Sequence, residues 1–137
     1  MNNIIRYVSA LYLSTLFISG CAYQPINFET FTGIGISDLE KARSTGKNKT
    51  VALSYDEAFN KVNSILESND LTVFLVSKEK KYIVAIGFPR QTDTTRVGIF
   101  FTPIDTGNTE ITLSSLSSTA LAKAEKIIFN GIENTGK

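Results

Sequence analysis

The connections between the β-like segments of this chain are short, and this limits the folds it can adopt. After residue 70, four segments are rich in β-branched and aromatic residues: 71–77, 82–88, 96–102 and 109–116. Polar, Pro-containing or Gly-containing turns of four to seven residues separate them. Parallel strands need a crossover of about a dozen residues or more, so we expect antiparallel pairing.

Helix signals frame these strands. Ser54 and Glu57 have the spacing of a capping box, which predicts a helix up to residue 68 behind a short strand at 51–55. A second amphipathic helix is expected over 119–132, after a capping serine. We therefore predict an α+β domain with the order β-α-β-β-β-β-α. Its antiparallel sheet of about five strands would carry both helices on one face.

The N-terminus shows a different pattern. Arg6 precedes an uncharged, mainly apolar run over 7–18, and the motif Ile18-Ser19-Gly20-Cys21 ends it with the chain's only cysteine. The run is shorter than the ~20 residues that a stable membrane span needs. It ends in small residues, as a cleaved signal does. The pattern resembles the lipobox of bacterial lipoproteins; an ordinary secretory signal and an N-terminal anchor helix are the alternatives.

The resemblance implies a membrane anchor. In that family the Cys21 thiol would carry diacylglycerol, and a type II signal peptidase would recognise Ile18, Ser19 and Gly20 and cut before Cys21. The new amine would then be acylated. Enterobacterial members kept in the inner membrane have Asp at the next position, whereas this chain has Ala22. The resemblance thus favours the periplasmic face of an outer membrane; in a cell without one, the anchor would face outward.

This interpretation divides the chain into a signal peptide (1–20), a lipidated Cys21 with its tether (21–49) and a small α+β domain (50–137). Once Cys21 is acylated no thiol remains for a disulfide, so the domain folds by packing alone. The chain has 14 Lys and Arg side chains, and Arg6 leaves with the signal, so 13 basic face 13 acidic residues. Such a balance argues against nucleic acid as a partner.

Catalytic chemistry is not evident. The chain has no histidine, which removes the usual general base at neutral pH and the commonest metal ligand. The carboxylates are scattered among a predicted helix start, turns and the solvent-exposed face of the strand expected over 109–116. The sequence therefore predicts a protein that is not an enzyme and that binds no cofactor or metal.

The middle strands are apolar on both faces, so one face of the sheet is a candidate for a partner. We expect Phe74, Ile83 and Phe100 to share the face that the helices leave open, because exposed apolar patches usually mark binding sites. Alternatively, the tether folds back and covers this face with apolar side chains, namely Ile26, Phe28, Phe31 and Ile34.

These observations favour a lipid-anchored, non-catalytic binding or assembly module whose partner is another envelope protein. The alternative is a periplasmic carrier or chaperone for a hydrophobic small molecule or lipid. A large pocket lined by Phe74, Ile83 and Phe100 would favour the carrier, and a flat face would favour the protein partner.

Overall fold

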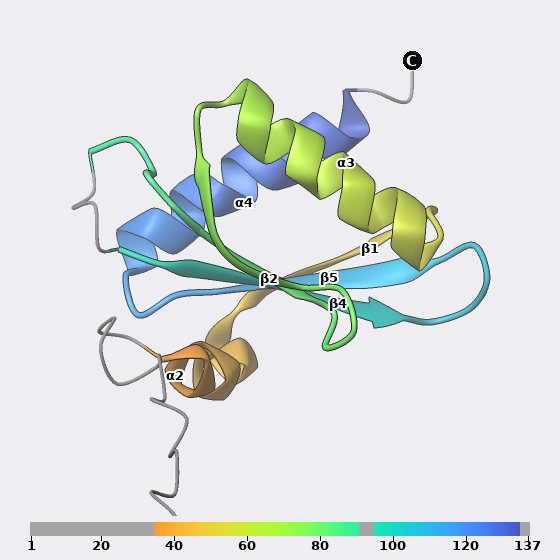
Figure 1. The fold of residues 1–137 in the computed structure, drawn as a ribbon, viewed down its shortest axis with the longest axis horizontal. Helices are drawn as coiled ribbons and strands as arrows, with labels where there is room; N and C mark the ends of the chain where they lie inside the picture. Colours follow the sequence, from red (N-terminus) through yellow and green to blue (C-terminus); the bar gives the residue numbers. More distant parts are fainter. Residues whose placement is uncertain (1–34, 91–94, 135–137) are drawn as a thin grey trace, which may run out of the picture.

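The computed structural model describes residues 35–90 and 95–134, which form one sheet with helices on both faces (Figure 1). In chain order the elements are α2 (Ile36–Lys41), the 3-10 turn η2 (Ala42–Thr45), β1 (Lys47–Val51), α3 (Tyr55–Ser68), β2 (Thr72–Ser77), β3 (Tyr82–Ile86), β4 (Val97–Pro103), β5 (Thr109–Ser114) and α4 (Ser118–Glu133). The strands lie in the order β1-β5-β4-β3-β2, and every neighbouring pair is antiparallel. β1 and β2 are therefore the edge strands.

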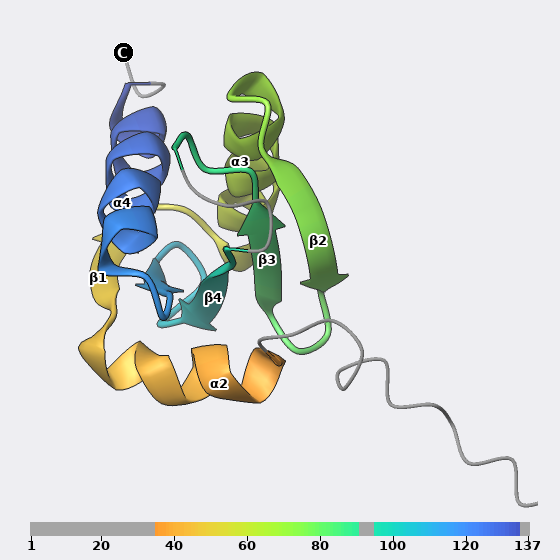
Figure 2. The ribbon, with the colours of Figure 1, turned by 90° about the vertical axis from the view of Figure 1, so that its left-hand side faces the viewer.

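The predicted α+β class and five-stranded antiparallel sheet are confirmed. α3 and α4 cover one face of the sheet, and α2 lies across the other (Figure 2). The predicted element order is incomplete because it lacks this third helix, and helices do not lie on one face only. α2 has six residues and buries only Leu39. So short a helix leaves no repeating apolar stripe in the sequence.

Local capping signals fix the starts of both long helices. The Ser54 hydroxyl accepts the Glu57 backbone N–H, and the Glu57 carboxylate accepts the Ser54 hydroxyl and backbone N–H, a complete capping box. These two hydrogen bonds, the hydroxyl's first, lower the pKa of Glu57. At α4 the Ser117 hydroxyl accepts the Ala120 backbone N–H at 3.2 Å. Both predicted caps are confirmed.

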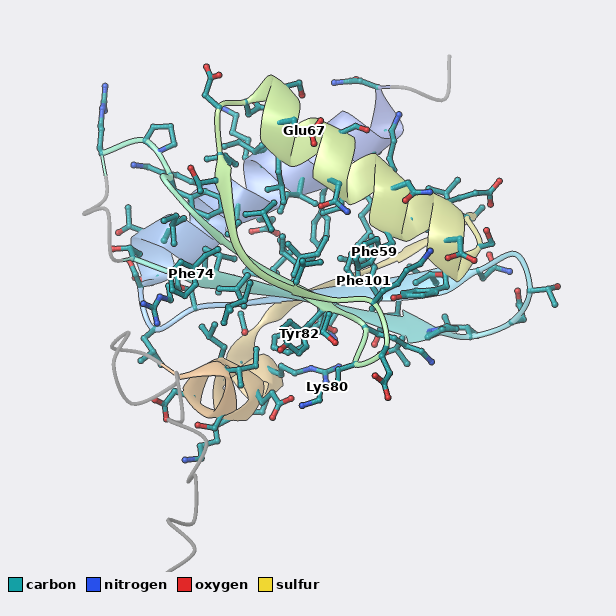
Figure 3. All side chains as sticks on the ribbon, in the orientation of Figure 1. Phe59, Glu67, Phe74, Lys80, Tyr82 and Phe101 are labelled. Carbon is teal, nitrogen blue, oxygen red and sulfur yellow. The ribbon has the colours of Figure 1, made fainter. Side chains whose placement is uncertain are left out.

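The main core lies between the sheet and the α3–α4 layer. Phe59 of α3 and Phe101 of β4 point toward each other there (Figure 3), with ring centroids 5.3 Å apart. Tyr55 completes the cluster, with its ring centroid 6.0 Å from that of Phe101. Aromatic pairs at such distances add about 0.5–1.5 kcal/mol beyond their burial. The cluster therefore anchors the start of α3 over β4.

β1 begins earlier in the chain than the expected strand at 51–55. It pairs with β5 along its whole length, from Lys47 opposite Leu113 to Val51 opposite Thr109. The expected tether boundary at residue 49 therefore falls inside a strand. The sequence signal was weak because Lys47–Val51 contains two lysines and an asparagine, which are uncommon in strands.

Two contacts attach the segment before β1 to β5. The Ser114 hydroxyl donates a buried hydrogen bond to the Leu39 carbonyl at 2.7 Å. At Gly46, an added Cβ would lie 2.3 Å from the Leu113 carbonyl oxygen, so only glycine permits this close approach. Residues 35–46 are thus packed on the domain.

This packing predicts how truncation affects stability. The division expected from the sequence places the whole folding unit after residue 49. From the contacts above, we expect a chain that begins at Gly35 to melt cooperatively. A chain that begins at Thr50 loses α2 and most of β1, and we expect it to melt at a much lower temperature or without a cooperative transition. Circular dichroism melts of the two chains test this, and equal melting temperatures would contradict it.

Candidate docking surface

The three residues expected to share the open face do not lie together. Ile83 pairs with Ile99 and belongs to the core beneath α3 and α4. Phe100 pairs with Tyr82 and lies on the opposite face, where Phe74 packs against the same cluster. The grouping of Ile83 with Phe100 is therefore wrong. β3 is apolar on both faces, so alternation in its sequence gave no clue to its register.

α2 closes the middle of this second face. Leu39, Val84 and Phe100 form a small buried cluster, and Phe100 is only 3% exposed. The Arg43 guanidinium lies over the Phe100 ring, 4.6 Å from its centroid. Of the two alternatives for this face, the structure supports cover by the preceding segment, through Ile36 and Leu39. The cover expected from Ile26, Phe28, Phe31 and Ile34 lies outside the described residues.

Apolar surface remains where the sheet ends at β2. Val76 is 55% exposed, and Phe74, Leu75 and Tyr82 are half-buried. Val76 pairs with Ile83, which places it on the α3 face beyond the reach of the helices. A β-bulge between Val73 and Leu75 lets Phe74 and Leu75 both pack on the α2 side. We call the outer side of Thr72–Ser77 the β2 edge.

A cation supports the ring at the centre of this strand. The Arg96 guanidinium lies 4.2 Å from the centroid of the Phe74 ring, and the residue is 6% exposed. Burial lowers the pKa of Arg96, which nevertheless stays charged at neutral pH. A stacked guanidinium of this kind holds Phe74 in place at the bulge.

The two sheet edges are protected to very different degrees. β1 carries Lys47 and Lys49, which form ion pairs with Glu125 and Glu133 of α4. Lysines on an edge strand are a common device against unwanted strand pairing. β2 has the sequence TVFLVS, with no charge and no proline. Within the described residues, β2 pairs with β3 alone. In the part of the chain that the structure describes, the protection of β2 against strand pairing is its bulge.

A separate groove of about 700 Å³ lies at the opposite edge of the domain. Residues 49–53, one side of α3 and the end of α4 line it. Leu53 and Ile132 contribute half-buried apolar surface, and the Lys49–Glu133 ion pair borders it. Its volume suits a small molecule. The residues expected to line a ligand pocket were Phe74, Ile83 and Phe100. None of them lines this groove.

Asp56 and Asp105 take part in structural contacts near the surface. Asp56 pairs with Lys78 at 2.8 Å, and Asp105 accepts the Gly107 N–H and the Asn108 side-chain amide in a turn. The Asn108 bond and then the Gly107 bond lower the pKa of Asp105. Over 35–90 and 95–134, no group of three or more carboxylate, His or Cys side chains could hold a metal ion.

In the same part of the chain, no helix is long and apolar enough to cross a bilayer.

The β2 edge is a candidate surface that the sequence pattern does not reveal. The signal was present, because Thr72–Ser77 lacks the lysines that β1 has, but which strand lies at an edge depends on the sheet order. Cys21 and the recognition residues Ile18, Ser19 and Gly20 lie outside the described residues, so the lipobox remains a prediction.

Comparisons with known proteins do not assign this chain to a family. No protein-family model matches it, and no curated protein matches it significantly. The features that bear on function are therefore the lipobox pattern and the geometry of the described residues.

Proposed function

We propose that this chain is a lipid-anchored envelope lipoprotein that acts as a non-catalytic binding or assembly module and docks another envelope protein through the β2 edge. The observation that supports docking is the contrast between the two sheet edges. β1 carries lysines tied to α4, while β2 is uncharged and exposes Val76. An unprotected apolar edge is a template for strand addition.

The anchor in this proposal rests on the motif Ile18-Ser19-Gly20-Cys21. Lipid on Cys21 places the protein on a membrane, and Ala22 favours the periplasmic face of the outer membrane. Thirteen residues, 22–34, separate Cys21 from the packed segment at Gly35. Such a length spans at most about 45 Å when fully extended. The domain therefore works close to the bilayer and meets partners at or near that surface.

Strand addition would use both the backbone and the side chains of β2. The outward N–H and C=O groups of the strand would pair with the incoming backbone, which supplies affinity. The half-buried side chains of Phe74 and Leu75 on one face, and Val76 on the other, would select apolar residues at alternate positions. No catalytic group takes part in this binding.

The second candidate function is a carrier for a hydrophobic small molecule or lipid. The groove of about 700 Å³ favours it, because Leu53 and Ile132 give it apolar surface and the Lys49–Glu133 ion pair gives it a polar border. A carrier would bind through this groove and not through β2. The two functions therefore predict sensitivity to substitutions at opposite edges of the sheet.

We expect Val76→Lys to abolish partner binding without unfolding the domain. A lysine on the edge must be desolvated when a strand adds there, which opposes pairing. The measurement is chemical crosslinking in intact cells, followed by pull-down of the lipidated chain. Asn48→Lys is the matched control, since Asn48 is an exposed residue of the β1 edge. If Val76→Lys retains every crosslinked product, the β2 edge is not the docking surface.

A further inference from the structure

The charges at the two ends of β2 identify a partner for this edge. Ahead of the strand lie two exposed carboxylates, Glu67 in the last turn of α3 and Asp70 in the turn between α3 and β2, with no basic residue between them. Just after it lies the exposed turn Lys78-Glu79-Lys80-Lys81. The edge thus has an acidic start and a basic end. A complementary partner needs the opposite order along its length.

An antiparallel copy of the same strand meets this requirement. Rotation by 180° about an axis that is perpendicular to the sheet and lies just outside the middle of β2 places the acidic start of each copy beside the basic end of the other. We propose that the β2 edge docks a second copy of this chain by antiparallel β2–β2 pairing, which gives a two-fold dimer with one continuous ten-stranded sheet. This inference rests on the proposed docking function of the β2 edge and names its partner.

Charge pairs inside each copy leave this complementarity in place. Lys78 is engaged by Asp56 of the same chain, with 2.8 Å between ammonium nitrogen and carboxylate oxygen. Lys81 lies over the Tyr55 ring, with its ammonium nitrogen 5.8 Å from the ring centroid. A cation above a ring still attracts a carboxylate. Counting Asp56, the basic end retains a net charge of +1, opposite the −2 of Glu67 and Asp70.

The dimer would also cover the exposed apolar surface. Val76 faces the α3 side of the sheet, where it is 55% exposed at the margin of the α3–α4 layer. In the two-fold arrangement, the α3 helices of both copies flank the joint on that same face. Val76 would then lie between the two copies. Isologous contacts of this kind close on themselves, so pairing stops at two copies.

The bulge limits where the copies pair. It interrupts the β2–β3 ladder between Val73 and Leu75, while Leu75–Ser77 continues in regular register. Bulged edges twist away from flat, open-ended stacking. A bulge on β2 is therefore compatible with one closed partner and opposes growth of extended sheets.

The test measures the mass of the full lipidated chain in detergent by sedimentation equilibrium over a range of protein concentrations. We expect a monomer–dimer equilibrium for the native chain. Replacing Lys80 and Lys81 by Glu leaves both ends acidic, and replacing Glu67 and Asp70 by Lys leaves both ends basic. Each pair of substitutions should weaken the dimer about tenfold or more, because like charges then meet.

Combining all four substitutions provides the decisive control. The ends are again opposite in sign but exchanged, so the dimer should recover to near the native dissociation constant. Far-ultraviolet circular dichroism verifies that each variant is folded. A native chain that stays monomeric at every concentration overturns the inference. A dimer that no charge variant weakens, or that the combined variant fails to restore, overturns it as well.

A measurement in cells separates this inference from the proposed function. A cysteine introduced at Val76 is oxidised to a disulfide only with a second cysteine nearby, and the crosslinked mass identifies the neighbour. A product of twice the chain mass supports the dimer. If position 76 instead crosslinks to a different protein and no doubled mass forms, the dimer is overturned while docking at the β2 edge stands. If no doubled mass forms at all, the dimer is overturned, and the Val76→Lys comparison decides separately whether a different protein docks at the β2 edge.

Discussion

The Phe100→Asp variant is expected to lose most of the stability of the domain. Phe100 is 3% exposed and is packed against Leu39 and Val84 beneath α2. Truncation of a buried Phe alone costs about 3–5 kcal/mol, and a buried carboxylate adds a desolvation cost of several kcal/mol. Domains of this size are stable by roughly 5–15 kcal/mol, so most or all of that stability would be lost.

Arg43 offers a partial compensation that can be measured. Its guanidinium lies 4.6 Å from the Phe100 ring centroid and would attract the new carboxylate. Combining Phe100→Asp with Arg43→Gln should therefore destabilise the domain further. Val76→Asp is the matched control, because it also introduces a carboxylate on an apolar strand position but is 55% exposed. Urea unfolding of the native chain and the three variants, followed by circular dichroism, gives the free energies of unfolding. If Phe100→Asp is as stable as Val76→Asp, α2 does not cover this face.

The Cys21→Ser variant is expected to lose all fatty-acid labelling. In the proposed lipoprotein, the Cys21 thiol is the atom that carries diacylglycerol, and a serine hydroxyl is a far weaker nucleophile toward the same donor. The variant should keep residues 1–20 or be cut elsewhere, so its mass should also change. Metabolic labelling with a fatty-acid analogue, followed by intact-mass measurement, reads both effects.

Ser19→Ala serves as the matched control for the anchor. It keeps a small residue beside the cleavage point and leaves the thiol unchanged, so labelling should persist. If Cys21→Ser is labelled as strongly as the native chain, the lipobox interpretation fails. The described domain and its β2 edge would then belong to a protein attached to the membrane in some other way, or not attached to one.

The sequence was informative where the signals were local. The capping box at Ser54, the alternation in residues 109–114 and the short turns predict four of the five strands and both long helices nearly in place. These features depend on neighbours within a few residues. Antiparallel pairing then followed from the length of the connections.

The sequence was uninformative where distant contacts decide. α2 is stabilised by Leu39 and by the Ser114 hydroxyl, 75 residues further along the chain. β1 contains two lysines, yet it forms a strand because β5 supplies its ladder and α4 supplies its counter-charges. The sequence does not show the face of Ile83, because the side chains on both faces of β3 are mainly apolar and buried or half-buried. Such outcomes depend on the sheet order and register, which periodicity does not contain.

The candidate sites also differ in whether local sequence or distant contacts define them. The lipobox is a contiguous motif, so the sequence alone suggests it. The β2 edge is defined by what does not pair with it, and that requires the order β1-β5-β4-β3-β2. Once the order is known, the absence of charge in Thr72–Ser77 becomes meaningful. The same composition in a central strand would signify only a buried core.

Site-directed photo-crosslinking in intact cells tests the central claim, that this anchored module binds through the β2 edge. A photoreactive residue at position 76 reports on β2, and the same residue at position 48 reports on the opposite edge, β1. We expect a discrete protein adduct from position 76 and none from position 48. Adducts from position 48 alone, or from neither position while the labelled chain is lipidated and folded, would contradict it.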